Sequence, residues 1–312
     1  MTLVQLSYIV ALDTHRHFSI AAKHCHVTQP TLSMQLQQLE EELGVILFDR
    51  SKKPVVPTEI GIEVVAQARM VLREAERMGE LVNNARAEVS GELRLGIIPT
   101  LAPYLLPLFL TKFIEEHPKV HIRIREHTTD ELVERLRTNQ LDAGILATPL
   151  NDSAILEQPL FYEEFIAYVA NGQAGAGKKK YILTEEIDPE RLWLLEEGHC
   201  MRSQIINLCE LRRTGDAGRV EYAAGSIETL KKIVEMSAGI TMLPELATFG
   251  MQPAEGAALR RFHPPAPARE ISLVTHRAYV KQQLLDALRQ SVLSVIPERM
   301  KSPEKKSVVE VR

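Results

Sequence analysis

Residues 17–50 read HFSIAAKHCHVTQPTLSMQLQQLEEELGVILFDR, and this stretch decides the fold of the N-terminal part of the chain. Its pattern predicts a short alanine-containing helix, a tight turn at His26-Val27 and a second helix. Thr28 is a good N-cap for that helix, and Pro30 falls in the first turn, where a missing amide hydrogen costs little. The stretch therefore predicts two short helices joined by a turn.

The second helix is amphipathic, with leucines spaced by four, three and four residues. This spacing places them on one face and leaves the other face free to project. A helix-turn-helix presents its second helix to the DNA major groove in this way, although the periodicity alone also fits an ordinary helical hairpin. The leucines are Leu32, Leu36, Leu39 and Leu43.

The same segment resembles the N-terminal winged helix-turn-helix of LysR-type bacterial transcriptional regulators. The resemblance implies a DNA-binding domain over residues 1–58, with a wing at the basic run 50–53, and double-stranded operator DNA as a partner. Thr31, Ser33 and Gln37 would then read bases, and Arg50 and Lys52 would meet phosphates. The matching motifs are Ala21-Ala22, Thr28-Gln29-Pro30, Leu32-Ser33, Leu39-Glu40, Leu43-Gly44, Leu47-Phe48 and Arg50, and the DNA-binding candidates are Thr28, Gln29, Pro30, Thr31, Ser33, Gln37, Arg50 and Lys52.

The net charge of the chain is lower than is usual for a protein with a DNA-binding domain. The chain carries −4, and residues 1–58 hold five basic and five acidic groups. A basic domain is the usual electrostatic footprint on DNA. The charges are segregated, however, and we expect Glu40-Glu41-Glu42 to end the second helix on the side far from the basic wing, with a second subunit supplying further DNA contacts.

The composition predicts a soluble protein of two or more domains. The chain has 312 residues, of which 45% are hydrophobic and 25% charged, as is ordinary for globular proteins. It contains no apolar run of about 18 residues and no signal-peptide pattern at its start, so we expect a cytoplasmic protein with no membrane partner. Three cysteines in that compartment are expected to be thiols rather than structural disulfides.

A long helix is predicted over residues 59–90. Between residues 58 and 88 there is no proline, and apolar residues repeat with a period of 3.5, as in the seam of a two-stranded coiled coil. A single amphipathic helix packed on its own domain also fits that pattern. In LysR-type regulators a linker helix that pairs two subunits occupies this position, which implies a dimer and, with further contacts, a tetramer. The seam residues are Val64, Ala68, Val71, Ala75, Met78 and Val82.

Beyond Gly91 the pattern alternates strands with helices, which predicts an α/β effector domain with a parallel sheet. Strands are expected at 93–98, 120–124 and 142–147, with helices at 104–116 and from Thr128-Thr129 to 139. A second such set is expected at 165–262, and residues 270–275 with the following helix would return to the first set. Two subdomains joined in this way resemble the LysR effector domain, itself similar to periplasmic binding proteins. The expected division is subdomain I at 91–163 and 268–300, subdomain II at 164–267, and a charged mobile tail at 301–312.

The chemistry is predicted to lie at Cys200. It follows a glycine turn, begins a helix, and has His199 and Arg202 beside it. A helix N-terminus and nearby cations stabilise a thiolate. The plainer interpretation is a buried structural thiol, because free cysteine packs as a small hydrophobe.

Several motifs resemble the hydrogen peroxide sensors within the LysR family over nearly the whole chain. The resemblance implies that Cys200 is the peroxidatic cysteine and Cys209 the resolving one, with no cofactor. It further implies a peroxide pocket formed by Thr100, Thr129, His199, Arg202 and Arg269. The matching segments are residues 15–18, 25–27, 98–100, 103–107, 198–202, 226–230 and 239–244.

These observations predict a homo-oligomeric, peroxide-responsive transcription factor rather than an enzyme. Cellular thiol reductants would reset its disulfide, and RNA polymerase is a further candidate partner. Two alternatives stay open: a LysR regulator that binds a small organic anion, with the cysteines as bystanders, and a thiol peroxidase fused to a DNA-binding domain. If one helix runs from Cys200 to Cys209, residues 201–208 must unwind before the two cysteines can join, since nine residues of helix span roughly 13 Å and a disulfide needs α-carbons within about 7 Å.

Other conspicuous residues have plain interpretations. The segment His24-Cys25-His26, with His15 and His17, suggests a metal site, but consecutive helical residues point in different directions and cannot chelate one ion. We expect no metal, and we expect Cys25 to pack inside the helix-turn-helix. Residues 175–178 resemble a fragment of a phosphate-binding loop without its full spacing, which indicates a solvated turn.

Overall fold

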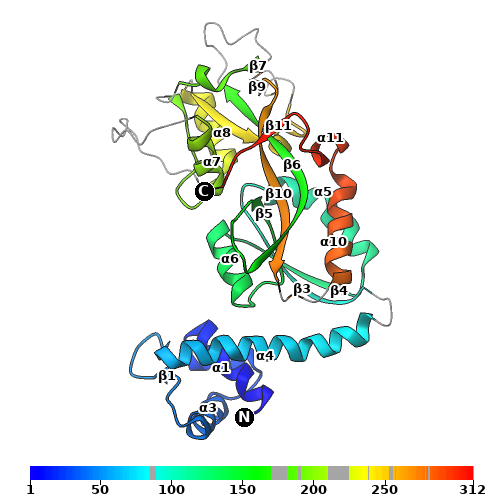
Figure 1. Cartoon of the computed structure of the whole chain (residues 1–312). Coiled ribbons are helices and arrows are strands. Elements are labelled where there is room, and N and C mark those ends of the chain that lie inside the picture. Colours follow the sequence, from blue (N-terminus) through cyan, green and yellow to red (C-terminus); the bar gives the residue numbers. More distant parts are fainter. Residues whose placement is uncertain are drawn as a thin grey trace. The chain divides into compact units, whose positions relative to one another are not determined.

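The structure is a computed structural model that describes residues 1–84, 89–169, 181–188, 191–209, 225–237, 239–252, 256, 258–277, 279 and 282–311. The chain forms two compact units, residues 1–88 and 89–312 (Figure 1). The first unit contains α1 (Leu3–His15), α2 (Phe18–His24), α3 (Gln29–Leu43), β1 (Phe48–Asp49), β2 (Val56–Pro57) and α4 (Glu59–Asn84).

The second unit is an α/β domain. Its first half contains β3 (Gly91–Ile97), α5 (Ala102–Glu116), β4 (Val120–Glu126), α6 (Thr129–Arg137), β5 (Ala143–Thr148) and β6 (Ile155–Val169). The chain continues through β7 (Tyr181–Ile182), η1 (Thr184–Glu186), α7 (Cys200–Leu208), α8 (Ile227–Ser237), β8 (Ile240–Pro244), η3 (Glu245–Thr248) and β9 (Leu259–Phe262). It ends with β10 (Ala266–His276), α10 (Gln282–Val295), α11 (Glu298–Lys301) and β11 (Lys306–Val308).

The helix-turn-helix forms as the sequence predicts. Helix α2 ends at the turn, where His26 has a φ of 55°, and Thr28 caps α3 with its side-chain oxygen. Leu32, Leu36 and Leu39 are fully buried against α1 and α2. The fourth leucine of the predicted face, Leu43, is instead 39% exposed, because it lies in the last turn before the left-handed Gly44 ends the helix.

The wing is a two-stranded hairpin in which β1 pairs with β2 in antiparallel orientation and residues 50–55 form the tip. The expectation that the glutamates lie far from this basic segment is wrong. The carboxylate of Glu40 accepts a hydrogen bond from Arg50 at 2.6 Å, and its other oxygen accepts from the amides of Leu47 and Phe48. Glu40 therefore joins α3 to the wing, and the Arg50 guanidinium pairs with a carboxylate of its own domain.

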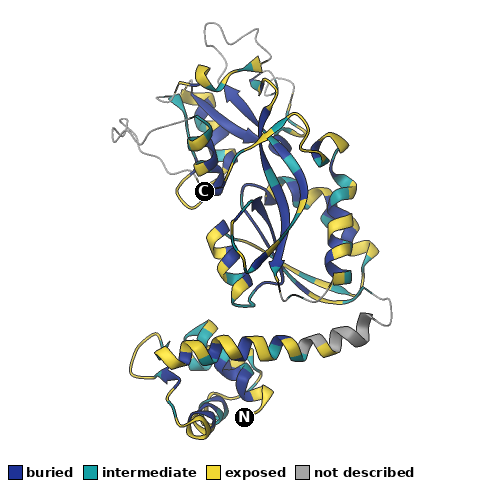
Figure 2. Ribbon diagram, in the orientation of Figure 1, coloured by how far each residue is buried: buried dark blue, intermediate teal, exposed yellow. Residues whose placement is uncertain are grey.

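Helix α4 has two different halves. Near its start, Val65 and Ala68 are buried in the core of the N-terminal unit, and Leu72 packs against that core. Further along, the seam residues Val71 and Met78 are 37% and 66% exposed. Figure 2 shows exposed positions in yellow along the described part of this helix. Packing on its own domain therefore accounts for the first half of the predicted seam only. The side chain of Val82 lies outside the described residues.

The first half of the effector sheet is parallel, as predicted. Strand β3 pairs with β4 on one side and β5 on the other, both in parallel register. Strand β4 alternates half-buried and exposed residues, whereas every residue of β5 is buried. Helices α5 and α10 lie beside each other, and their apolar residues join the core beneath this sheet.

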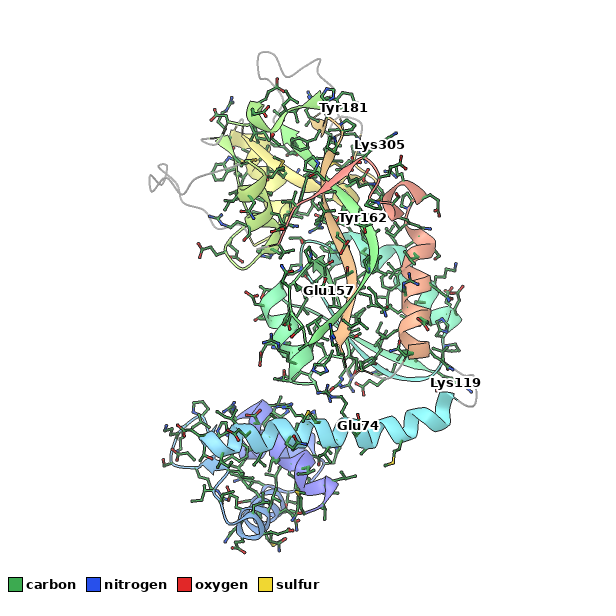
Figure 3. All side chains as sticks on the ribbon, viewed as in Figure 1. Glu74, Lys119, Glu157, Tyr162, Tyr181 and Lys305 are labelled. Carbon is green, nitrogen blue, oxygen red and sulfur yellow. The ribbon has the colours of Figure 1, made fainter. Side chains whose placement is uncertain are left out.

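The second half is not the parallel repeat that the sequence pattern predicts. Strand β6 pairs with β8, β9 and β10, in each case antiparallel, whereas β7 pairs with β9 in parallel. The described strands follow the order β4-β3-β5-β10-β6-β9-β7. Both β6 and β10 run through the two halves, and Figure 3 labels Glu157 and Tyr162 along the continuous β6. The expected subdomain boundaries at 163/164 and 267/268 therefore fall inside strands, which local periodicity could not reveal.

The expectation of a mobile C-terminal tail is also wrong. Residues 298–301 form α11, and β11 pairs in parallel with the start of β10. Val311 is only 4% exposed. Within the described ranges, none of the helices combines the length and the hydropathy that a bilayer crossing requires.

Candidate redox site and DNA-binding surface

Cys200 is the first residue of α7, as the sequence predicts. His199 is the extended N-cap residue, and Gly198 before it has a φ of +95°, a conformation that favours glycine. Cys200 is 7% exposed and belongs to the core of the first half of the domain, whereas Met201 belongs to the core of the second half. The cysteine therefore lies where the two cores meet, at the helix end that favours negative charge.

The N-terminus of α6 faces this turn. A methyl group placed on Gly198 would lie 3.6 Å from Cγ2 of Thr128, the N-cap residue of α6. Thr129 follows in the first turn of α6 and is buried, and its hydroxyl is among the buried polar atoms that have no hydrogen-bond partner in the described part of the chain. A buried hydroxyl without a partner is unusual, and it leaves capacity for a small polar ligand.

Arg269 and Thr100 lie together, as expected from the resemblance. The guanidinium of Arg269 is fully buried and donates to the Thr100 hydroxyl at 2.9 Å and to the Thr100 carbonyl at 3.2 Å. It also donates to the Glu163 carboxylate at 2.9 Å, which in turn accepts from the amide of Leu246. Burial raises the pKa of Glu163, and the Arg269 charge and these N–H donors oppose that shift. The buried arginine is thus fixed in position by one carboxylate and one threonine.

Arg202 lies in the first turn of α7 but on a different face from Cys200, and Cys209 lies at the other end of the helix. Arg202 is two residues after Cys200, about 200° around the helix, and its guanidinium donates to the Leu195 carbonyl at 2.8 Å. This hydrogen bond links α7 to the segment that precedes it. Cys209 is the C-cap residue, at the opposite end of a nine-residue helix. Burial raises the pKa of the Cys209 thiol to about 11, so this thiol is protonated at neutral pH.

Three side chains of this region, two of them buried and one half-buried, were not among the predicted site residues. Gln204 is fully buried one turn after Cys200, and its Oε1 has no described partner. Glu163 holds Arg269, and the buried Nε2 of His127 also lacks a described partner beside the α6 N-cap. Only Gln204 had a sequence signal, because positions 200 and 204 share a helix face. The other two come from strand β6 and a loop, where spacing carries no such information.

The predicted DNA-binding side chains lie on the solvent side of α3 and on the wing. Thr28 and Thr31 share a hydrogen bond of 2.8 Å between their hydroxyls, and Gln37 donates to Glu41. Gln29 accepts from Ser19 of α2 at 2.6 Å. These bonds fix the side chains before any DNA is bound. Pro30 is exposed, Ser33 is half-buried on the same helix, and Lys52 is exposed on the wing.

The histidines of the N-terminal unit show a single ring contact, between His15 and His24 at 4.9 Å between ring centroids. Among the residues that the structure describes, no three histidine, cysteine or carboxylate side chains are grouped to hold a metal ion. Cys25 packs against the helix-turn-helix core, as the sequence predicts. The fragment at 175–178 lies outside the described residues.

A winged helix-turn-helix, a long helix and an α/β domain with a thiol at a helix N-terminus together define a DNA-binding transcriptional regulator with a sensing domain. Residues 3–62 match the bacterial regulatory helix-turn-helix proteins of the lysR family, and residues 86–296 match the LysR substrate binding domain. The chain belongs to the LysR family of bacterial regulators.

Known members provide a closer comparison. The hydrogen peroxide-inducible genes activator of Haemophilus influenzae is 36% identical over 274 residues, which cover 88% of this chain and 90% of that protein. A full-length OxyR variant from Pseudomonas aeruginosa has a TM-score of 0.80 at 34% identity and covers 95% of this chain and 99% of its own. A Corynebacterium glutamicum OxyR variant in its H2O2-bound state has a TM-score of 0.58 at 29% identity, covering 94% of this chain and 92% of its own.

Proposed function

We propose that this chain is a transcription regulator that responds to hydrogen peroxide by forming a disulfide between Cys200 and Cys209. The observation that carries the proposal is the position of Cys200, buried at the start of α7 after a turn that faces the N-terminus of α6, where the Thr129 hydroxyl has no partner among the described residues. Thr100, Thr129, His199 and Arg269 form the polar surroundings of the peroxide, and Arg202 acts by bracing the turn. The similarity to peroxide-inducible activators, and to an OxyR variant in its H2O2-bound state, supports this ligand.

The reaction has two steps. The Cys200 thiolate attacks one oxygen of hydrogen peroxide, the O–O bond breaks, and the departing hydroxide takes a proton to become water. The resulting sulfenic acid then reacts with the Cys209 thiol, which forms the S–S bond and releases a second water. A dithiol reductant reverses the change. The raised pKa of Cys209 argues against this thiol as the one that attacks peroxide, because a protonated thiol is a poor nucleophile.

Disulfide formation requires α7 to unwind. The helix runs without interruption between the two cysteines, which places their α-carbons roughly 13 Å apart along its axis, whereas a disulfide needs them within about 7 Å. Residues 201–208 must leave the helix, and Met201 and Ile205 must leave the core that they occupy. The redox change therefore alters the surface of the effector domain.

On the DNA side, Thr31, Ser33 and Gln37 contact bases, and Arg50 and Lys52 contact phosphates, with Thr28, Gln29 and Pro30 at the helix N-terminus against the backbone. The exposed apolar residues Val71 and Met78 of α4 pair two subunits, and effector-domain contacts complete a tetramer. RNA polymerase is the partner through which the bound regulator activates transcription. The cytoplasm, where operator DNA and thiol reductants occur together, is the compartment that fits these steps.

The alternative of an organic anion as effector is less well supported. Arg269 is fully buried, but its guanidinium is already bound to Glu163 and Thr100. The surface hollow that adjoins α6 is lined by Asp130, Glu134 and Asp152, and its one lining arginine, Arg137, already pairs with Asp152 at 2.6 Å. A thiol peroxidase is distinguished by turnover, because a sensor consumes about one peroxide for each reduction cycle. We infer that the chain is not an enzyme.

Footprinting on the chain's own upstream DNA tests the proposal. Adding one equivalent of peroxide to the reduced protein should change the protected region, and peptide mass analysis should identify a Cys200–Cys209 bond. Alkylating the free thiols beforehand should abolish the change. A footprint that still changes after alkylation would favour the organic-anion alternative, and repeated peroxide consumption with limiting reductant would favour the enzyme.

A further inference from the structure

The C-terminal segment docks across β10 instead of extending into solvent. Its strand β11 pairs with Ala266, Pro267 and Ala268, and backbone hydrogen bonds extend this pairing at both ends. The Ala266 amide donates to the Lys305 carbonyl at 3.0 Å, and the Val309 amide donates to the Ala268 carbonyl at 2.9 Å. Figure 3 labels Lys305 just before this strand. The docked strand thus lies directly beside Arg269.

The end of this segment contacts α7. The buried side chain of Gln204 donates through Nε2 to the Val309 carbonyl at 2.8 Å. Val309 packs against the core that contains Met201 and Ile205, and with which Cys209 is also in contact. In Figure 1 the red C-terminal segment crosses β10 and ends near α7. One peptide segment therefore contacts the helix that must unwind.

Val311 extends this contact toward the reactive cysteine. Its side chain is 4% exposed and belongs to the same core as Cys200. Val308, only three residues earlier, is 37% exposed, so the segment has an inner and an outer side. Val309 and Val311 thus join the two cores to which Met201 and Cys200 of α7 belong.

The segment has a natural hinge before β11. Helix α11 is anchored by the ion pair of Arg299 with the buried Glu245 at 2.8 Å. At the start of β11, the Lys306 side chain donates to the carbonyls of Arg299 and Ser302. Lys305, the residue before the strand, has a φ of 60°. Residues 302–305 form a turn, so the strand after it can detach while α11 remains in place.

We propose that residues 306–311 are a redox-sensitive latch that holds α7 in the dithiol state and detaches when the disulfide forms. This inference rests on the proposed Cys200–Cys209 switch. Unwinding of α7 removes the Gln204 side chain from the Val309 carbonyl and disperses the apolar residues on which Val309 and Val311 pack. A segment that binds one state only shifts the equilibrium toward that state, so the latch makes the disulfide easier to reduce.

A pair of variants, one on each side of the latch, tests whether docking of the latch makes the Cys200–Cys209 disulfide easier to reduce. Val311→Asp places a charge in a buried position of the docked segment, whereas Val308→Asp places the same charge at an exposed one. Each full-length protein is equilibrated with mixtures of reduced and oxidised dithiothreitol, and the Cys200–Cys209 disulfide is quantified by alkylation and mass spectrometry. Val311→Asp should shift the equilibrium constant toward the disulfide by about tenfold, which makes the reduction potential of the disulfide ~30 mV more negative. Val308→Asp should shift the equilibrium constant by less than about twofold.

Hydrogen exchange on the wild-type protein provides a second measurement that needs no variant. Amides of residues 306–311, including that of Val309, should be protected in the reduced protein and exchange rapidly in the oxidised protein. Equal protection in both states, with the disulfide confirmed, would overturn the latch, as would equal potentials for the two valine variants. If peroxide produces no Cys200–Cys209 disulfide in the wild type, the proposed function itself fails, which is a separate result.

Discussion

Helices α3 and α7 carry the two activities assigned to this chain, and they are stabilised in different ways. Helix α3 has 15 residues, a side-chain N-cap from Thr28, a left-handed glycine at its C-cap and three fully buried leucines. Helix α7 has nine residues, no side-chain cap at His199 and no left-handed residue at Cys209. Helices shorter than about 12 residues are marginal by themselves, so α7 depends on its neighbours.

This difference suits the two functions. A helix that reads DNA must present its side chains in one fixed geometry, and α3 carries the capping and burial that fix it. A helix that must unwind during a redox reaction needs a small free-energy difference between its two states. The contacts that stabilise α7 are tertiary. Gln204 donates a hydrogen bond to the Val309 carbonyl, and the apolar residues of α7 pack into the cores of the two halves of the domain.

The largest effect is expected for Cys200→Ser. This substitution should abolish the change in DNA footprint on peroxide addition while leaving DNA binding by the reduced protein intact, because α3 folds in a separate unit from Cys200. Cys25→Ser is the control. Burial raises the pKa of Cys25, so it stays protonated, and its replacement should cost roughly 1 kcal/mol or less of stability. A Cys200→Ser protein that still responds to peroxide would refute the redox assignment.

Hydrogen exchange compares the two helices directly. On oxidation, amides of residues 201–209 should lose protection and approach the exchange rate of unstructured chain, while those of α3 should stay unchanged. The measurement is made by mass spectrometry on reduced and peroxide-treated protein, with the disulfide verified in the same samples. Unchanged protection in α7 would mean that the two cysteines meet by some route other than unwinding.

Arg50→Ala tests how the wing supports α3. Loss of a phosphate contact should weaken binding to all DNA sequences and reduce the slope of log affinity against log salt by about one unit. It should also lower stability, because Arg50 pairs with the largely buried Glu40. The control is Lys52→Ala, whose ammonium lies 3.9 Å from Asp49 on an exposed part of the wing. That variant should weaken DNA binding and reduce the salt slope in the same way, without lowering stability. An Arg50→Ala protein with altered base preference but the same salt slope would contradict the wing assignment.

The smallest effect concerns pH. The pKa of Cys209 is raised by burial from its ordinary value near 9 to about 11, so the unfolded chain releases this proton first as pH rises. The contribution of the Cys209 thiol to the free energy of unfolding is therefore fully present below about pH 9 and is lost as pH rises toward 11. Urea unfolding of the reduced protein at pH 8 and pH 10 should show this loss, and Cys209→Ala should reduce it. If both proteins lose the same stability, burial of the thiol is not its cause.

Local sequence was sufficient for the features that depend on neighbours along the chain. Thr28, Pro30 and Gly44 set the ends of α3, and the spacing of Leu32, Leu36 and Leu39 set its buried face, because capping and helical periodicity act over a few residues. The alternation of strands and helices gave the parallel β4-β3-β5 arrangement for the same reason. The position of Cys200 at the start of a helix also followed from the glycine turn before it.

Only the tertiary structure decided the features that join distant segments. Arg269 contacts Glu163 and Thr100, which lie 106 and 169 residues away, and Gln204 contacts a carbonyl 105 residues later. The continuity of β6 and β10, the Arg50 pairing with Glu40 and the docking of the charged C-terminal segment belong to the same group. Each depends on which strand edge or buried carboxylate is available after the chain has folded, and neither composition nor periodicity specifies that pairing.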